Sequence, residues 1–493
     1  MFKVSPLFGD HAVLPVGKEL RIFGAADEGE VIRARLTAAD GAVTGEGEVT
    51  ARNGRFLIHL PAQKMNAAPL TLTLTSDSAE YTANDLRIGL VFMAGGQSNM
   101  EWGLWNAEGG REVIRTHEDA DLRYFNVPRV SVLDEAGLAA HEAAHWQQIA
   151  PHVGGDMSAV AYFFAREVRR ELGVPVGIVG CNWGGTSILS WMDETALDRC
   201  GPAMKAAADY ESQYGEIPLD EWQRKQNAFQ RDMDEWNGKV AKIKETNPGI
   251  EWAEIEKQAG VCPWNPPPGP GSPYRPGQLH RTMVEKIVPM ALTGILFYQG
   301  ETDSGRPEVY GDMLITLVTR WRELFGDAEL PFYNVQLPMH IEAGARDDGS
   351  WARLRQAQEK AWRTLRNSYL AVMLDAGEYG NIHPVDKLTP GTRLAQLFLG
   401  DDETPRALAK STQGAVLTVE LTHPVQGEPE LFEVAGEDGV YVPANAVLDG
   451  CRIRLSAEGV AHPVKARYAW VNWGKVRVFG ENGLPLAPFV LDN

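Results

Sequence analysis

Apolar and polar positions alternate at the two ends of the chain. Residues 1–88 contain short runs in which apolar and polar side chains take turns, separated by Gly and Asp turns such as Asp40-Gly41. An alternation with a period of two is typical of half-buried β-strands. The same texture returns in residues 405–493, for example over 415–421. We therefore predict a β-sandwich-like module at the N-terminus and a second β-module at the C-terminus.

Residues 89–404 have a different pattern, in which continuous apolar runs alternate with helical stretches. A run without polar interruption is typical of a strand that is buried on both faces of a parallel sheet. Strands that alternate with helices indicate an α/β fold, here a central α/β/α parallel-sheet sandwich. The expected strands are Leu90–Ala94, Val176–Cys181, Gly294–Tyr298, Phe332–Gln336 and Leu370–Leu374, and the expected helices are Ser158–Leu172, Gln278–Val288, Tyr310–Leu324 and Trp351–Leu365.

One stretch, at about residues 195–277, interrupts this central pattern. A charged, helix-like segment over 220–244 gives way to a proline-rich segment over 262–270. Because proline-rich segments are semi-rigid, we predict a helical excursion with a fixed return, inserted in the central domain. Three roles stay open for this insertion: a wall of the functional site, a subunit contact, or a longer scaffold. The oligomeric state is also open.

Composition and charge narrow the function classes. With 44% hydrophobic and 23% charged residues, the chain has the composition of a folded globular protein. Its formal net charge of -19 disfavours nucleic acid as a partner, because phosphate backbones are bound by clustered Lys and Arg. We expect no signal peptide, because the opening residues contain no long apolar run and no Ala-x-Ala cleavage site, and no membrane span, because no apolar run reaches about 20 residues. A periplasmic or secreted location stays open if a leader was removed.

The cysteines and motifs give no sign of a metal or other cofactor. Cys181, Cys200, Cys262 and Cys451 are widely spaced and form no Cys-x-x-Cys pair, so we expect buried free thiols. Neither a His-Glu-x-x-His zinc motif nor a phosphate-binding loop occurs. We therefore expect chemistry that needs no cofactor.

The sharpest local feature is the turn Gly95-Gly96-Gln97-Ser98-Asn99-Met100, directly after a predicted strand. Groups at the carboxyl ends of parallel strands face the ligand crevice of an open α/β sheet. A serine at the start of a helix also has its hydroxyl near the positive end of the helix dipole. Ser98 is therefore a candidate nucleophile, although the same position suits a helix N-cap equally well.

Three more turns follow predicted strands and end on the same edge of the sheet. They are Asn182-Trp183-Gly184-Gly185-Thr186-Ser187, Tyr298-Gln299-Gly300-Glu301-Thr302-Asp303 and Gly380-Asn381-Ile382-His383-Pro384. A Gly-Gly turn lets a backbone N–H approach a ligand closely, the Gln299 amide can donate to an oxyanion, and His383 can act as a base. Together the four turns meet the needs of acyl transfer.

The order of these motifs resembles the sialate O-acetylesterase family of carbohydrate esterases, within the SGNH-hydrolase superfamily. The N-terminal module resembles that family's leading domain. The closing module is similar through Arg467-Tyr468-Ala469-Trp470 and the segment 482–489. The likeness covers most of the chain, with residues 195–277 as the chief exception.

The resemblance implies a role for each matched residue. Ser98 is expected to attack the acetyl carbonyl, and His383 to take its proton and later protonate the leaving sugar hydroxyl. The oxyanion would be held by the backbone N–H of Ser98, the N–H of Gly185 with Gly184 as the near alternative, and the amide of Gln299. The expected supporting residues are Asn99, Glu301, Asn381 and Asp375.

One departure from the wider superfamily concerns the third triad member. That superfamily often has an acid three residues before the histidine, where this chain has Gly380. Two alternatives follow: a dyad in which the Asn381 carbonyl fixes the histidine tautomer, or a triad completed by Asp375 or Asp386. His340, which also ends a predicted strand, is the fallback base.

Sugar binding predicts aromatic platforms, and Trp102, Trp105, Trp183 and Trp191 lie close to the four turns. We expect one or two of them, first Trp102 and Trp183, to line the site. The expected substrate is an acetylated sugar, most directly an O-acetylated sialic acid. Acetylxylan or another plant polysaccharide is the alternative ester substrate, and a non-catalytic carbohydrate-binding protein is the alternative from another class.

Overall fold

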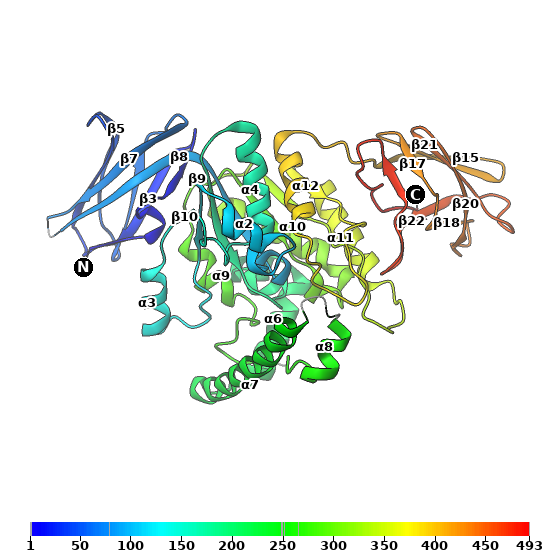
Figure 1. Ribbon diagram of the computed structural model, residues 1–493, viewed down its shortest axis with the longest axis horizontal. Coiled ribbons are helices and arrows are strands. Elements are labelled where there is room, and N and C mark those ends of the chain that lie inside the picture. The colour runs from blue at the N-terminus through cyan, green and yellow to red at the C-terminus, as the bar shows by residue number, and fades with distance from the viewer. Residues whose placement is uncertain (1, 78, 248–249, 251, 265, 493) are drawn as a thin grey trace.

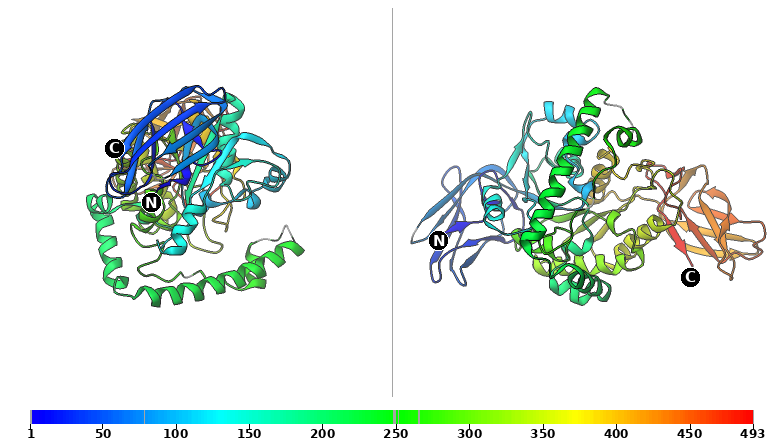
Figure 2. Two further views of the ribbon diagram at one scale, coloured as in Figure 1. Left: turned by 90° about the vertical axis from the view of Figure 1, so that its left-hand side faces the viewer. Right: turned by 90° about the horizontal axis from the view of Figure 1, so that it is seen from below.

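A computed structural model describes residues 2–77, 79–247, 250, 252–264 and 266–492 (Figure 1). It has a central α/β region, with β-rich regions at the two ends of its longest axis. Figure 2 shows the same arrangement from two further sides. Outside the described residues lie 1 and 78 of the predicted N-terminal module, 248–249, 251 and 265 of the predicted insertion, and 493 of the predicted C-terminal module.

The central sheet is mostly parallel, in the order β9-β11-β8-β12-β13-β14 with β10 antiparallel at the edge beside β9. The α/β class predicted from the sequence is confirmed. Because β11, β8 and β12 are neighbours, the turns that follow them lie side by side. The strands are β8 (Glu80–Gly96), β9 (Asp119–Asn126), β10 (Gln147–Ile149), β11 (Val176–Asn182), β12 (Gly294–Tyr298), β13 (Phe332–Val335) and β14 (Ser368–Ala371).

Helices pack around this sheet and connect its strands (Figure 1). The expected helix 278–288 is shorter than predicted, because it ends at Thr282 and the 3₁₀ turn Val284–Lys286 follows. The helices of residues 98–188 and 278–399 are α1 (Ser98–Glu101), α2 (Gly110–Thr116), α3 (Glu135–Ala143), α4 (Ala159–Leu172), α9 (Gln278–Thr282), α10 (Pro307–Leu324), α11 (Ser350–Thr364) and α12 (Leu388–Leu399), with short 3₁₀ turns η2 (Leu104–Asn106), η3 (Ile188–Trp191), η4 (Val284–Lys286) and η5 (Glu301–Asp303).

The N-terminal β-region and the central sheet share strand β8. The first half of β8 pairs with β7 and β2, and its second half pairs with β11 and β12. The predicted boundary at 88/89 therefore falls inside one continuous strand, and the apolar residues on both sides of it belong to one core. The N-terminal elements are β1 (Lys3–Val4), η1 (Pro6–Phe8), β2 (Val13–Pro15), β3 (Leu20–Ala25), β4 (Val31–Ala38), β5 (Val43–Thr50), β6 (Arg55–Leu60) and β7 (Asn66–Thr75).

The C-terminal β-region has a core of its own, to which the central region adds Met339, Val372 and Leu374. Hydrogen bonds from α11 also join the two regions: the Trp351 N–H donates to Asn472 Oδ1 over 2.9 Å. The strands of the C-terminal β-region are β15 (Ala407–Gln413), β16 (Val416–Leu421), β17 (Val425–Gly427), β18 (Phe432–Ala435), β19 (Val442–Pro443), β20 (Asn445–Asp449), β21 (Arg452–Ser456), β22 (Lys465–Tyr468), β23 (Val478–Gly480) and β24 (Phe489–Leu491).

The segment of residues 195–277 contains helices α5 (Glu194–Arg199), α6 (Gly201–Tyr214), α7 (Leu219–Thr246) and α8 (Trp252–Ala259). Helices α7 and α8 lie below the central region in Figure 1. The proline-rich stretch that leads back to the central region is hydrogen-bonded to the helices of this segment. The Trp222 indole donates to Pro267 O over 3.0 Å, and the Tyr210 hydroxyl donates to Gly269 O over 3.1 Å.

The expectation about the cysteines is resolved by the fold. All the cysteines are free thiols, but only Cys181 and Cys200 are buried; Cys262 is half-buried and Cys451 is exposed, so the prediction of burial is wrong for these two. Over the part of the chain that the structure describes, none of the helices combines the length and apolar character that a membrane crossing requires.

Candidate active site

The structure brings Ser98 and His383 into direct contact. The Ser98 Oγ and the His383 Nε2 are 2.8 Å apart. Ser98 begins helix α1, directly after β8, and His383 lies in the loop between β14 and α12. The chain can turn between β8 and α1 because Gly96 has a φ of +133°, and a Cβ there would lie 2.1 Å from the Tyr298 carbonyl oxygen.

The loop that carries His383 is held by polar side chains. The Asn381 side chain accepts from the His383 N–H and donates to the His383 carbonyl, both over 3.0 Å. The Glu378 carboxylate accepts from Asn381 Nδ2 over 2.7 Å and from the Val385 N–H over 2.8 Å. Asn381 therefore supports His383 through its side chain, whereas the sequence pointed to its backbone carbonyl.

The imidazole of His383 is largely desolvated. The Trp102 indole stacks on it, with ring centroids 5.3 Å apart and an angle of 21° between the planes. Burial, together with the positive charge of Lys387, lowers the pKa of His383 from 6.5 to about 4. The imidazole is thus neutral at pH 7, which is the state a general base needs.

Among the described residues, no carboxylate forms a hydrogen bond with His383. Asp375 forms a two-pronged ion pair with Arg393, with both N–O distances at 2.7 Å. Asp386 instead accepts from the backbone and side chain of Thr389. His340, the fallback base, contacts Glu342 over 3.1 Å rather than Ser98. The geometry therefore matches the dyad alternative better than either triad.

The backbone N–H groups of Ser98 and Gly185 have no acceptor among the described residues. Gly184 lies directly against the serine, since a Cβ on it would be 3.4 Å from the Ser98 Cβ. The Gly184 N–H is already used, however, because it donates to Glu101 Oε2 over 2.5 Å. Of the two glycines, Gly185 is the one whose N–H is available to an oxyanion.

Gln299 departs from its predicted role. Its side chain is fully buried, and its amide nitrogen donates to Asp303 over 2.6 Å and to Gln97 and Thr186 over 3.2 Å each. With its donors used in this way, the Gln299 amide is not available to an oxyanion. It instead joins the turn after β12 to the turns after β8 and β11.

Asp303 completes this connection and was not singled out from the sequence. Its carboxylate is fully buried and accepts from the Ser187 hydroxyl over 2.6 Å and the Ile188 N–H over 2.8 Å, besides Gln299. Burial raises the pKa of Asp303 above its ordinary value. Its position as the last residue of the Tyr298–Asp303 motif was the signal that could have identified it.

A second buried network lies behind the dyad. Asn99 Nδ2 donates to Glu301 Oε1 over 2.6 Å and to the Ile382 carbonyl over 3.0 Å, so it ties helix α1 to the histidine loop. Asn99 Oδ1 accepts from Lys387 Nζ over 2.6 Å. Burial raises the pKa of Glu301 and lowers that of Lys387 to about 7. Asn99 and Glu301 thus lie next to the histidine loop, and they are joined by Lys387, which the sequence did not indicate.

The predicted aromatic platforms differ in their surroundings. Trp191 is fully buried in the core, Trp102 is stacked on His383, and Trp183 is partly buried against the core. Trp105 is exposed. None of these four is the residue that lies over the Gly185 turn.

That residue is Trp264, from the proline-rich part of the inserted segment. A Cβ on Gly185 would lie 2.4 Å from the Trp264 indole, so the ring packs directly on the glycine. Trp264 is 51% exposed, and its ring is edge-on to Phe229 and Tyr274 with centroids 6.1 Å from each. The sequence could not indicate this contact, because residues 195–277 lie outside the motifs.

Comparison with known proteins bears directly on the predicted resemblance. Residues 263–383 match the family model described as carbohydrate esterase, sialic acid-specific acetylesterase. A sialate O-acetylesterase of Rattus norvegicus is 26% identical over 347 residues, which cover 65% of this chain and 58% of that protein. One from Homo sapiens is 24% identical over 346 residues, covering 65% and 55%.

A solved structure is similar over the whole chain. The crystal structure of a carbohydrate acetylesterase from Xanthomonas citri aligns with a TM-score of 0.76 and 26% identity, covering 100% of this chain and 99% of that chain. The resemblance predicted from the four turns is thereby confirmed. The matches to the rat and human proteins span less than two thirds of those proteins' lengths.

Proposed function

We propose that this protein is a serine esterase that hydrolyses O-acetyl esters on carbohydrates, with O-acetylated sialic acid as the first substrate to test. The observation that carries the proposal is the 2.8 Å contact between Ser98 Oγ and a desolvated His383 Nε2 at the carboxyl end of the central sheet. The free N–H groups of Ser98 and Gly185 support it, as do the relatives named for this activity.

The proposed reaction proceeds in two halves. His383 takes the proton of Ser98 as the hydroxyl oxygen bonds to the acetyl carbonyl carbon, and the resulting oxyanion accepts from the Ser98 and Gly185 N–H groups. When this intermediate collapses, the bond to the sugar oxygen breaks and His383 gives its proton to that oxygen. Water then attacks the acetyl-enzyme, with His383 again as base, and acetate leaves.

We propose a dyad rather than a triad for this chemistry. The side chains of Asn381 and Asn99 hold the histidine loop, and the Trp102 ring fixes the plane of the imidazole. These contacts supply the orientation that an aspartate supplies in serine proteases.

The finer features of the fold belong to the same proposal. The central region is proposed to be an SGNH-type α/β/α catalytic domain over 89–404, with an insertion at about 195–277 and flanking β-modules over 1–88 and 405–493. The parallel strands β9-β11-β8-β12-β13-β14 support the central domain, and the separate core of the C-terminal strands supports the module over 405–493.

Trp264 supports an acetylated sugar as the partner of this site. A half-exposed indole beside the Gly185 N–H presents an apolar surface next to the point where an oxyanion would form. The apolar face of a sugar ring is a suitable partner for such a surface. The insertion would then be a wall of the site, which selects one of its three open roles.

A substrate panel tests the proposal. Acetate release is measured from O-acetylated sialic acids, from acetylated xylo-oligosaccharides and from p-nitrophenyl acetate, with the wild type and Ser98→Ala. Hydrolysis by the wild type and a loss of about 10⁴-fold or more in Ser98→Ala are expected. Turnover by Ser98→Ala at the wild-type rate would overturn the nucleophile assignment. Preference for the xylo-oligosaccharides would favour the polysaccharide esterase, and glycan binding without any turnover would favour the non-catalytic alternative.

A further inference from the structure

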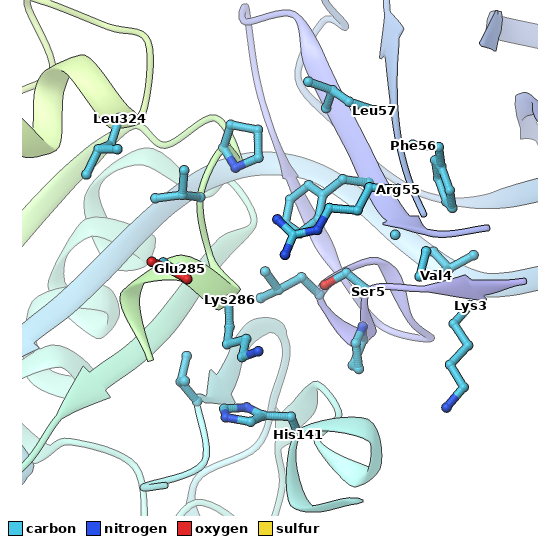
Figure 3. A pocket seen from close by; sticks show the side chains of 18 of the residues that line it. Lys3, Val4, Ser5, Arg55, Phe56, Leu57, His141, Glu285, Lys286 and Leu324 are labelled. Atoms are coloured by element: carbon cyan, nitrogen blue, oxygen red, sulfur yellow. The ribbon is translucent and has the colours of Figure 1, made fainter. Parts of the chain in front are cut away.

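A large pocket lies away from Ser98, between the N-terminal β-region and the central region (Figure 3). Its volume is about 1140 Å³. Its walls come from β1, β3 and β6 on one side and from α3 and the η4–β12 connection on the other. None of the residues of the Ser98–His383 site lines it. The pocket therefore needs an explanation of its own.

The charges on its walls are unbalanced toward the positive. Two lining cations are neutralised internally, Lys3 by Glu142 over 2.5 Å and Arg320 by Asp193 over 2.8 Å. The remaining lining cations, Arg52, Arg55 and Lys286, form no ion pair or side-chain hydrogen bond within the described part of the chain. Glu285 is the one lining acid there that is likewise unpaired. Such an excess is unexpected in a protein with a net charge of -19.

Two of the unpaired cations face each other from different regions. Arg55 begins strand β6 of the N-terminal region, and Lys286 ends η4 of the central region. Figure 3 shows the Arg55 guanidinium and the Lys286 ammonium both directed into the pocket. Lys286 is about half-buried, and this burial lowers its pKa. The negative charge of Glu285 offsets this only in part, and the positive charge of Arg55 adds to the lowering. An anion placed between the two cations would relieve the remaining cost.

The size and the remaining walls indicate what kind of anion fits. Ligand pockets commonly measure about 300–1,000 Å³, so this volume exceeds what an inorganic ion needs. Apolar side chains, including Phe56, Leu57 and Leu324, line much of the remaining space, together with a few polar residues such as Thr50 and His141. An organic ligand of sugar size, with one anionic group and one less polar face, matches both features.

We propose that this pocket binds an anionic sugar, whose carboxylate or phosphate group lies between Arg55 and Lys286. A guanidinium can hold either group through two parallel hydrogen bonds, and the ammonium adds a point charge from the opposite wall. Because its ligand contacts residues of both regions, such a sugar would also bridge the N-terminal β-region and the central region. The site does not depend on the proposed esterase chemistry.

Isothermal titration calorimetry on the full chain tests this site. The probes are N-acetylneuraminic acid as the carboxylated sugar, glucose 6-phosphate as the phosphorylated one, N-acetylglucosamine as a neutral sugar, and inorganic phosphate. We expect one of the two anionic sugars to bind, more weakly at higher salt, and its identity decides between carboxylate and phosphate. The neutral sugar should not bind measurably.

The variants locate the ligand. Arg55→Ala and Lys286→Ala should each weaken binding at least about tenfold, which corresponds to about 1.4 kcal/mol. Arg33→Ala is the matched control, because Arg33 is an exposed arginine of the same β-region whose charge is paired with Glu48 over 2.6 Å. It should bind as the wild type does, and so should Ser98→Ala. Thermal unfolding of each variant confirms that it is folded.

Three results would overturn the proposal. The first is wild-type affinity in both Arg55→Ala and Lys286→Ala. The second is equal binding of N-acetylglucosamine and the anionic sugars. The third is binding of inorganic phosphate alone, which would mark an adventitious ion only. If the titration succeeds and the substrate panel fails, this site stands without the proposed function; the reverse result leaves the esterase proposal intact.

Discussion

Two polar sites of this protein use opposite designs. At the Ser98–His383 site, buried polar side chains such as Gln299, Asp303 and Asn99 have hydrogen-bond partners within the protein. In the pocket between the two regions, Arg55 and Lys286 have none among the described residues. Partnered groups hold one another in fixed positions, whereas unpartnered charges are stabilised only when a ligand arrives. The comparison therefore distinguishes buried polar residues that hold the proposed catalytic groups in position from charged residues whose partner would be a bound ligand.

The largest effect is expected when His383, the proposed base, is removed. His383→Ala eliminates the proton acceptor 2.8 Å from Ser98 Oγ, so kcat should fall by about 10⁴-fold or more. Acetate release under saturating substrate measures the loss. A decrease of less than about tenfold would show that another group, such as His340, serves as the base.

Substitution of Asp375 and Asp386 tests whether His383 acts with or without a carboxylate partner. Asp375→Asn and Asp386→Asn should leave kcat within about threefold of the wild type, since one carboxylate pairs with Arg393 and the other with Thr389. In a serine protease, an Asp→Asn change in the triad lowers kcat by about 10⁴-fold. A loss of that size in either variant would establish a triad and refute the dyad.

A smaller loss of activity than in His383→Ala is expected at Asp303, whose carboxylate helps to join the turns after β8, β11 and β12. Asp303→Asn replaces one of the two oxygens that accept these three hydrogen bonds by an amide nitrogen that can only donate, so it should lower kcat by about 10²-fold and stability by about 1.5–3 kcal/mol. Kinetics and urea unfolding measure the two effects. Asp312→Asn is the matched control, because this carboxylate pairs with Lys360 at the surface. An active, fully stable Asp303→Asn would mean that the network does not position the site.

The local sequence pattern was sufficient to predict the four turns but not the hydrogen bonds that join them. Each of the four motifs is a short contiguous stretch, and the first three directly follow strands that are buried on both faces and so leave continuous apolar runs. Ser98 and His383 could therefore be found from the chain alone. The use of Gln299 could not, because whether an amide faces a ligand or another turn depends on how neighbouring strands are ordered in the sheet.

The same limit applies to the residues that were missed. Trp264 meets Gly185, and Lys387 meets Asn99, only after segments distant in the chain have packed together. The predicted boundary at 88/89 lies inside strand β8. This strand changes from a partly exposed to a fully buried pattern in mid-course, where it enters the central sheet, and this change is what the sequence pattern detected.

A smaller effect, specific to the substrate, is expected at Trp264. Trp264→Ala removes the exposed indole over Gly185 and should raise KM for an acetylated sugar about tenfold, as the loss of about 1.4 kcal/mol of contact implies. Turnover of p-nitrophenyl acetate, which has no sugar, should change much less. Trp264→Phe should recover part of the affinity. Val261→Ala, at an exposed position of the same segment, serves as the control, and equal losses on both substrates would remove the sugar from this interpretation.

An effect confined to acidic pH is expected at Lys387, a buried cation that donates to Asn99 Oδ1 over 2.6 Å. Its charge lowers the pKa of His383, which is about 4. Because a positive neighbour disfavours the imidazolium, Lys387→Met should raise that pKa and move the acid limb of kcat/KM upward by about one pH unit. The pKa of Lys387 itself is about 7, so the two enzymes carry the same charge here at pH 8 and should differ little in rate.

The pH profile of kcat/KM therefore separates the charge of Lys387 from its packing. Lys387→Met with Glu301→Gln is the matched variant, since it leaves no uncompensated carboxylate beside Asn99. It should show the same shift of the acid limb. If the limb stays in place while the rate at pH 8 falls, Lys387 acts by holding Asn99 and the histidine loop. In that case Lys387, like Gln299 and Asp303, stabilises the geometry of the site through its hydrogen bond, and its charge has no separate effect on His383.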